Sequence, residues 1–200
     1  MISLVLLAAG KSTRFPENKL LFRYQGEALV HRVVRVALAS KVYEVVVVTG
    51  HQSRLIKQAL EDLSSSPRLR FVFNRGYGHG MSSSVRVGVA AVSDSAEAAM
   101  FLPADVVLEN PRAINALVDY FSECRPRIAV VSYGGRRGHP ILFRRDMFSE
   151  VRRIREENQG LKALVRRYSG EIRDVQVAER AVLTDIDTPG DLAQGFSKIP

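Results

Sequence analysis

Cysteine is almost absent from this sequence, in which Cys124 is the only one among 200 residues. A single cysteine excludes a disulfide within the chain and argues against a metal ion held by thiolates. We expect Cys124 to be a small, partly buried side chain on a helix that includes residues 115–124. Nucleophilic catalysis by this thiol is the less favoured alternative.

Long apolar runs are also missing, although hydrophobic residues make up 46% of the chain and mean hydropathy is −0.04. No segment is long enough to predict a membrane span. The apolar start, residues 1–7, follows no basic region and is shorter than a signal peptide, so a strand is predicted there. These features favour a globular cytoplasmic protein, and 200 residues suit one α/β domain.

Acidic residues are outnumbered by basic ones, which gives a formal charge of +8 and a pI near 10.0. Much of the excess consists of arginine groups in the C-terminal half, as at Arg136-Arg137 and Arg166-Arg167. Aromatic residues do not alternate with them, as a base-stacking surface would require. An anionic small molecule therefore explains the charge at least as well as a nucleic acid does, and we expect neither nucleic acid nor membrane as a partner.

Strand-length apolar runs alternate with segments of helical period along most of the chain. The predicted strands are 2–8, 44–49, 69–73, 98–102 and 128–133, and the predicted helices are 28–39, 54–63 with Ser53 as its cap, 81–92, and one that starts at Asn110-Pro111. This alternation is typical of parallel strands joined by helical crossovers. It predicts an α/β fold, a Rossmann-like three-layer α/β/α sandwich with a mostly parallel sheet.

The rhythm changes after residue 133. We predict a hairpin over 134–140 that leads into 141–143, helices over 145–156 and 160–168, strands over 172–177 and 182–186, and a last helix from about Thr188-Pro189. No repeat, low-complexity segment or linker is visible. The expectation is therefore one domain over residues 1–200, with the later segments added to one edge of the sheet.

The loop after the first predicted strand carries the strongest functional signal. It contains Leu7, Ala8, Ala9, Gly10, Lys11 and Ser12, followed by Arg14 and Lys19. Small residues let a ligand approach the backbone closely, and successive amides in such a turn bind anions. The loop has neither the spacing of a Walker loop nor that of a dinucleotide fingerprint. We interpret it as a phosphate-binding loop with two added positive charges.

The whole segment over 7–19 resembles the L-A-[AG]-G-x-S-x-R-[MF]-G-x-[ND]-K signature of the MobA-like nucleotidyltransferases, the relatives of molybdenum cofactor cytidylyl- and guanylyltransferases. The resemblance continues along the chain. Asn74 with Gly80, Met81 and Ser82 is similar to the family's turn beside the base and ribose, and Asp105 is similar to its magnesium-binding aspartate. Its acceptor-side R-G-H-P segment resembles the stretch with Gly138, His139 and Pro140. Asp187 is similar to the second acid of its terminal D-I-D-T-P motif.

The resemblance implies a fold of the nucleotide-diphospho-sugar transferase type and specific roles. Lys19, Arg14 and Asp105 would be catalytic, Asp105 and Asp187 would bind Mg²⁺, and residues of the first loop would hold the triphosphate. It also implies a nucleotide-binding half over about 1–110 and an acceptor-binding half over about 111–200. Two departures from the pattern stand out: Pro16 replaces a usual glycine, and Val107 replaces a usual proline.

The implied reaction transfers CMP from CTP to the phosphate of a molybdopterin-type acceptor, with a molybdoenzyme as a client. Ala9 and the segment at Gly138 favour the cytidylyl branch. Alternatives stay open: a GTP-using enzyme, a sugar- or alcohol-phosphate nucleotidyltransferase of the same fold, and a non-catalytic accessory protein. Plainer roles are also open, since Asp187 and Ser82 can cap helices, and Lys19 can be a solvated charge.

Overall fold

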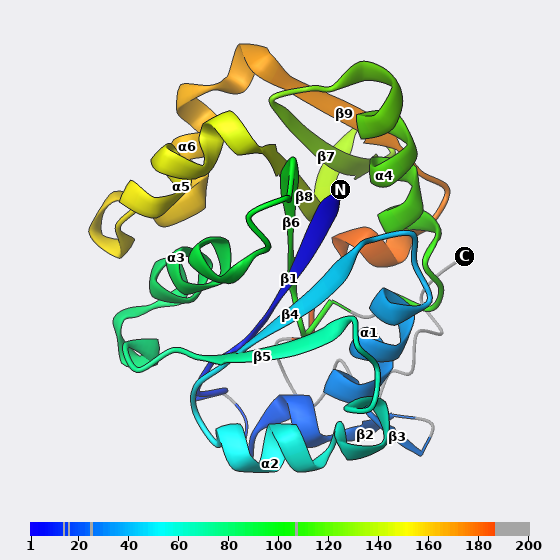
Figure 1. The fold of residues 1–200 in the computed structure, drawn as a ribbon, viewed down its shortest axis with the longest axis vertical. Helices are drawn as coiled ribbons and strands as arrows, with labels where there is room; N and C mark the ends of the chain where they lie inside the picture. The colour runs from blue at the N-terminus through cyan, green and yellow to red at the C-terminus, as the bar shows by residue number, and fades with distance from the viewer. Residues whose placement is uncertain (14, 16, 25, 107, 187–200) are drawn as a thin grey trace.

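A seven-stranded sheet forms the centre of the computed structural model, which describes residues 1–186 except 14, 16, 25 and 107 (Figure 1). In their order across the sheet, the strands are β5 (Leu69–Phe73), β4 (Glu44–Thr49), β1 (Ile2–Ala8), β6 (Ala98–Pro103), β8 (Arg136–Arg144), β7 (Ile128–Tyr133) and β9 (Ile172–Gln176). Only β8 is antiparallel, to both β6 and β7. The predicted mostly parallel sheet is therefore confirmed.

The central strands are buried on both faces, as their continuous apolar sequences predicted. On β1, Leu4 and Leu6 belong to one core cluster and Val5 to the other, because alternate side chains of a strand point to opposite faces. Parallel pairing in register sets Val5 between Val46 of β4 and Phe101 of β6. The two hydrophobic layers that enclose the sheet thus follow directly from the strand sequences.

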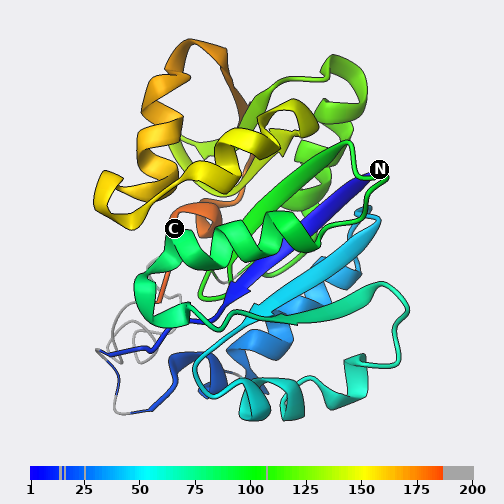
Figure 2. The same ribbon diagram turned by 60° about the vertical axis from the view of Figure 1, so that its left-hand side comes forward.

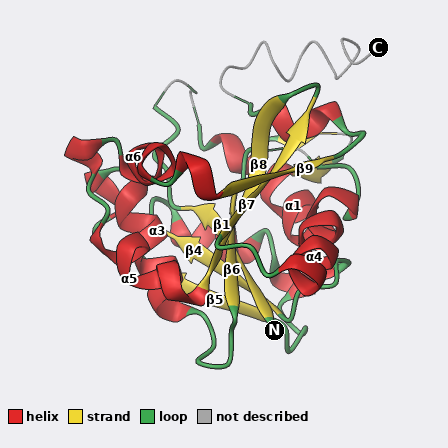
Figure 3. Ribbon diagram, turned by 90° about the horizontal axis from the view of Figure 1, so that it is seen from above, coloured by secondary structure: helices red, strands yellow, loops and turns green. Residues whose placement is uncertain are grey.

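Helices cover both faces of this sheet (Figure 3). Helices α1 (Leu29–Leu38), α2 (Ser53–Gln58) and α4 (Arg112–Cys124) contribute to one core cluster, and α3 (Met81–Ala91), α5 (Phe148–Arg153) and α6 (Gly160–Arg167) to the other. A two-stranded ribbon of β2 (Arg23–Tyr24) and β3 (Glu27–Ala28) precedes α1. The arrangement is the expected three-layer α/β/α sandwich.

Two predicted helices are shorter than their sequences suggested. The helix over 54–63 begins at Ser53, ends at Gln58 and is followed by a 3₁₀ turn at Glu61–Leu63. Ser53 does not cap it, because its hydroxyl donates to Thr49 Oγ1 at 2.8 Å. The helix over 145–156 divides into a 3₁₀ turn, α5 and a second 3₁₀ turn at Glu156–Asn158, since Ile154 leaves the helical conformation and packs into the core.

Some expectations for the C-terminal half were wrong. The predicted strand over 182–186 is a 3₁₀ turn, Arg180–Leu183, followed by a single bridge between Asp185 and Val106. Val182 is buried by packing against β8 rather than by strand pairing, and a Cβ at Gly138 would overlap its carbonyl. Cys124 is exposed rather than partly buried.

Other expectations for this half were confirmed or lie outside the described residues. Two glycines with positive φ, Gly134 and Gly135, make the tight turn of the β7–β8 hairpin. The helix expected from Thr188 lies outside the described residues. No helix among the described residues is long and apolar enough to cross a membrane.

Candidate active site

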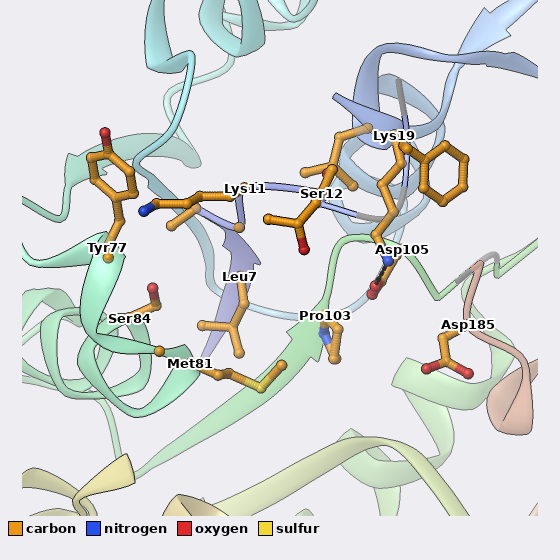
Figure 4. A pocket seen from close by; sticks show the side chains of 17 residues that line it. Leu7, Lys11, Ser12, Lys19, Tyr77, Met81, Ser84, Pro103, Asp105 and Asp185 are labelled. Atoms are coloured by element: carbon orange, nitrogen blue, oxygen red, sulfur yellow. Dashed lines mark ion pairs between the residues drawn. The ribbon is translucent and has the colours of Figure 1, made fainter. Parts of the chain in front are cut away.

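A pocket of about 500 Å³ opens where β1 and β6 end at their carboxyl edges (Figure 4). Open α/β sheets bind their ligands at this edge. Its lining comes from the loop after β1, from the start of α3, from the end of β6 and from the C-terminal segment: Leu7, Ala9, Gly10, Lys11, Ser12, Thr13, Phe15, Lys19, Leu20, Tyr77, Gly78, Gly80, Met81, Ser84, Pro103, Asp105 and Asp185.

The loop after β1 contributes Ala9, Gly10, Lys11, Ser12 and Thr13 to the lining of this pocket. Within the described part of the chain, the amides of Gly10, Lys11, Ser12 and Thr13 donate to no protein acceptor. Ser12 has a positive φ of 52°, and its carbonyl accepts from the Phe15 amide at 2.8 Å, which closes the turn. Successive amides held in such a turn form a site suited to phosphate oxygens.

Lys19 and Asp105 form an ion pair at the opposite end of the loop, shown by the dashed line in Figure 4. The distance from Lys19 Nζ to Asp105 Oδ2 is 2.6 Å, and the two side chains are 15% and 20% exposed. Asn18 fixes the lysine by capping its 3₁₀ turn, Lys19–Leu21, through a bond from the Leu20 amide. Lys19 Nζ also donates to the Ile186 carbonyl at 2.6 Å, which ties the loop to the C-terminal segment.

The turn before α3 is organised by Asn74, which is almost fully buried. Its side-chain amide donates to the hydroxyls of Ser83 and Ser84, and its carbonyl oxygen accepts from the Gly76 amide at 2.9 Å. These bonds use the polar atoms of Asn74 inside the protein. The side chain therefore shapes the turn, whereas Gly80 and Met81 line the pocket.

His139 lies on β8 next to the acidic end of the site. Its Nδ1 is buried and has no hydrogen-bond partner among the described residues. Burial lowers the pKa of His139 below its ordinary value, an effect that the negative charges of Asp105 and Asp185 oppose. The ring is therefore neutral at pH 7, with one buried polar atom that has no partner among the described residues.

The carboxylates of the site suit Mg²⁺, the ion that the sequence resemblance implies. Asp105 and Asp185 both line the pocket, and carboxylate oxygens are the ligands this hard cation prefers. The described residues contain no ready group of three His, Cys, Asp or Glu side chains for a metal ion. A site with one or two carboxylates fits Mg²⁺, because water molecules and substrate phosphates commonly complete the coordination sphere of this ion.

The structure brings together most of the residues singled out in the sequence. Leu7, Ala9, Gly10, Lys11, Ser12, Lys19, Gly80, Met81 and Asp105 line the pocket, whereas Ala8, Asn74, Ser82, Gly138, His139 and Pro140 lie outside its lining. Ala8 points into the core on the α1 side, and Ser82 is bonded to Glu156. Arg14, Pro16, Val107 and Asp187 lie outside the described residues.

Tyr77 and Asp185 are among the lining residues that the sequence did not single out. Tyr77 follows Asn74 in the glycine-rich turn, and Lys11 Nζ lies 5.9 Å from the centre of its ring. Asp185 is two residues before the aspartate chosen from the same T-D-I-D segment. Both residues belong to motifs that the sequence analysis identified. Contacts between loops far apart in the chain, however, decide which side chains of these motifs face the pocket.

Comparison with known proteins places this fold and site in a family. Residues 4–172 match the family model described as the MobA-like NTP transferase domain. Purine catabolism protein PucB of Bacillus subtilis is 29% identical over 92% of this chain and 91% of its own length. A probable molybdenum cofactor guanylyltransferase of Thermococcus sibiricus is 26% identical over 78% of this chain and 75% of its own length.

The GlmU proteins that match are longer. The chain covers 45% of the bifunctional GlmU of Methylibium petroleiphilum, at 24% identity. Among solved structures, Rv0371c of Mycobacterium tuberculosis superposes with a TM-score of 0.83 over 96% of both chains, at 24% identity, which supports the fold. With the loop after β1 lining a pocket at the carboxyl edge of the sheet and a family match over most of its length, the chain belongs to the MobA-like NTP transferase family and is a nucleotidyltransferase.

Proposed function

We propose that this protein transfers CMP from CTP to the phosphate of a molybdopterin-type acceptor and releases pyrophosphate. One observation carries the proposal: a single pocket is lined both by the Lys19–Asp105 pair and by loop residues whose amides have no partner among the described residues. This combination offers hydrogen-bond donors for phosphate oxygens, a cation for their charge and a carboxylate for Mg²⁺. Both the metal and the acceptor are part of the proposal.

The reaction needs positioning and charge neutralisation rather than a protein nucleophile. An acceptor phosphate oxygen forms a bond to the α-phosphorus, the bond from this phosphorus to the bridging oxygen breaks, and pyrophosphate leaves with the bonding electrons. The amides of Gly10, Lys11 and Ser12 hold the leaving pyrophosphate, and Arg14 adds positive charge beside it. Lys19 stabilises the charge that develops on the α-phosphate.

The proposed Mg²⁺ would be held by Asp105 together with Asp187. When bound, it neutralises charge on the α-phosphate and the acceptor phosphate. Asp105 would supply a carboxylate oxygen to the ion, and Lys19, which also donates to the Ile186 carbonyl, would supply positive charge beside it.

The choice of CTP rests on Ala9, a pocket-lining residue in the loop that differs between cytidylyl and guanylyl branches. A guanylyltransferase is among the relatives, so GTP is the second candidate. For the acceptor, the proposal assigns Gly138, His139 and Pro140, within an acceptor half over about 111–200. The buried Nδ1 of His139, which has no hydrogen-bond partner among the described residues, supports this assignment. A molybdoenzyme is the proposed recipient of the product.

Thermal unfolding with each of the four ribonucleoside triphosphates, with and without Mg²⁺, tests the nucleotide site. A ligand that binds only the folded state raises the melting temperature, by an amount that grows with its concentration over Kd. We expect the largest Mg²⁺-dependent shift with CTP. Pyrophosphate release with CTP or GTP and molybdopterin as acceptor then tests the reaction. A preference for GTP would overturn the cytidylyl assignment, and no shift with any nucleotide would overturn the function.

A further inference from the structure

The first turn of α3 is held by a side chain from the other half of the chain. Glu156 lies in the 3₁₀ turn between α5 and α6, and its Oε2 accepts from the Ser82 amide at 2.8 Å. The first amides of a helix have no partner within the helix, and its N-terminus carries partial positive charge. The carboxylate of Glu156 accepts a hydrogen bond from one of these amides and its negative charge balances the partial positive charge. The N-cap residue of α3, Gly80, supplies no side-chain cap.

Two glycines make this contact possible. Gly80 has a φ of +86°, and a Cβ at this position would overlap the carboxyl group of Glu156. Gly160, at the start of α6, has a φ of +53°, and a Cβ there would overlap the hydroxyl of Ser82. The turn before α3 and the α5–α6 connection are thus fitted closely to one another, backbone against side chain.

The contact belongs to a larger packed surface. Helices α5 and α6 lie along the same face of the sheet as α3, as Figure 2 shows, and all three share one hydrophobic cluster. Hydrogen bonding by the Ser82 side chain, with the backbone amides of Ser82 and Met81, lowers the pKa of Glu156. The carboxylate is therefore charged at neutral pH, as helix capping requires.

The residues that Glu156 holds are next to the pocket. Gly80 and Met81 line it, and Ser82 follows them directly. We propose that Glu156 is a positioning residue, which sets the Gly80–Ser82 turn in the geometry that binds nucleotide, so that affinity for the nucleotide depends on the α5–α6 connection. This inference rests on the proposed nucleotide site and adds a residue that neither the motif nor the pocket lining contains.

Two substitutions and one matched control test the role. Glu156→Ala removes the carboxylate, and Glu156→Gln keeps an oxygen acceptor without its charge. The neighbouring Glu157→Ala is the control, because Glu157 is exposed and makes no ion pair or side-chain hydrogen bond within the described chain. The probe is CTP with Mg²⁺, with Kd measured by calorimetry at a temperature where every variant is folded.

We expect Glu156→Ala to raise the Kd about 5- to 10-fold and Glu156→Gln about 2- to 3-fold, with Glu157→Ala unchanged. Amide hydrogen exchange gives a readout without nucleotide, in which Ser82 exchanges about 10-fold faster in Glu156→Ala. If Ser82 exchanges at the same rate in Glu156→Ala, or if this variant has a lower melting temperature but the same Kd, the positioning role of Glu156 is wrong while the proposed function stands. Failure of the unsubstituted protein to bind any triphosphate would instead overturn the proposed function.

Discussion

Lys19 and Asp105 neutralise each other in the pocket, with 2.6 Å between Nζ and Oδ2. The lysine comes from the loop after β1, and the aspartate follows β6, the neighbouring parallel strand. Both therefore lie at the same edge of the sheet. The pair holds the loop in place before a ligand arrives, and it keeps a cation and a carboxylate at the position where phosphate and Mg²⁺ are proposed to bind.

Asp105→Ala is expected to abolish nucleotidyl transfer while leaving part of the nucleotide affinity, because the loop amides remain. A bound metal ion supplies several kcal/mol of transition-state stabilisation, so a loss of at least about 100-fold in rate is expected. Pyrophosphate release with saturating Mg²⁺ measures it. Asp94→Ala, at an exposed acid outside the pocket, serves as the control. Normal turnover by the Asp105 variant in metal-replete buffer would refute the role given to this carboxylate.

His139→Ala is expected to weaken the acceptor rather than the nucleotide. The buried Nδ1 of His139 is unbonded within the described chain, and a hydrogen bond to a ligand contributes about 0.5–1.5 kcal/mol. The KM for the acceptor should therefore rise up to about 10-fold, with the KM for CTP unchanged. Steady-state kinetics with each substrate varied in turn separate the two effects. A rise confined to the KM for CTP would move His139 to the nucleotide side.

The central strands were predictable because their signal is local. Strands such as Ile2–Ala8 and Glu44–Thr49 are continuous apolar runs, and burial on both faces leaves them no other role. The apolar residues of 182–186 give the same kind of signal, yet they do not form a strand. There, Val182 is buried in a 3₁₀ turn against Gly138, a contact that the local pattern does not contain.

One part of the candidate site could likewise be predicted from local sequence, and another part could not. Its loop and Asp105 follow strands directly, so motif and position along the chain identified them. Glu156 was assigned to a continuous helix, and its contact with Ser82 depends on α5 ending at Arg153 so that the next turn reaches α3. Pairing between distant loops is decided by tertiary packing, which a single sequence does not specify.

The cluster around His31 predicts how stability changes with pH. His31 Nδ1 lies 2.6 Å from Glu27 Oε1, and His31 Nε2 lies 2.8 Å from Asp62 Oδ2. Although burial lowers the pKa of His31, hydrogen bonds with Asp62 and Glu27 outweigh it and raise the pKa above 6.5. The stabilisation is fully present below pH 6.5 and is lost as pH rises through the higher pKa of the folded state.

Urea unfolding between pH 6 and 9 measures this contribution. The free energy of unfolding should fall over this range in the unsubstituted protein, and His31→Gln should remove that part of the slope. Glu27 affects stability at acidic pH instead. The hydrogen bond with Arg35 lowers the pKa of Glu27 to about 2, so the stabilisation by Glu27 is present above about pH 4.5 and is lost toward pH 2. An unchanged slope from pH 6 to 9 in His31→Gln would contradict the assignment.

Gly88→Ala reverses the usual effect of this substitution in a helix. Alanine normally favours a helix by about 1 kcal/mol over glycine. Gly88 lies on the buried face of α3, however, where a Cβ would overlap a methyl group of Val5 on β1. Overpacking of this kind costs about 1–3 kcal/mol, so the melting temperature should fall by roughly 2–4 °C for each kcal/mol. Gly170→Ala is the matched control, because nothing lies within 4 Å of its Cβ position and its φ is not in the left-handed region. A Gly88 variant at least as stable as this control would show that α3 can move away from β1 at little cost, and that its close packing does not fix the position of the turn at Gly80.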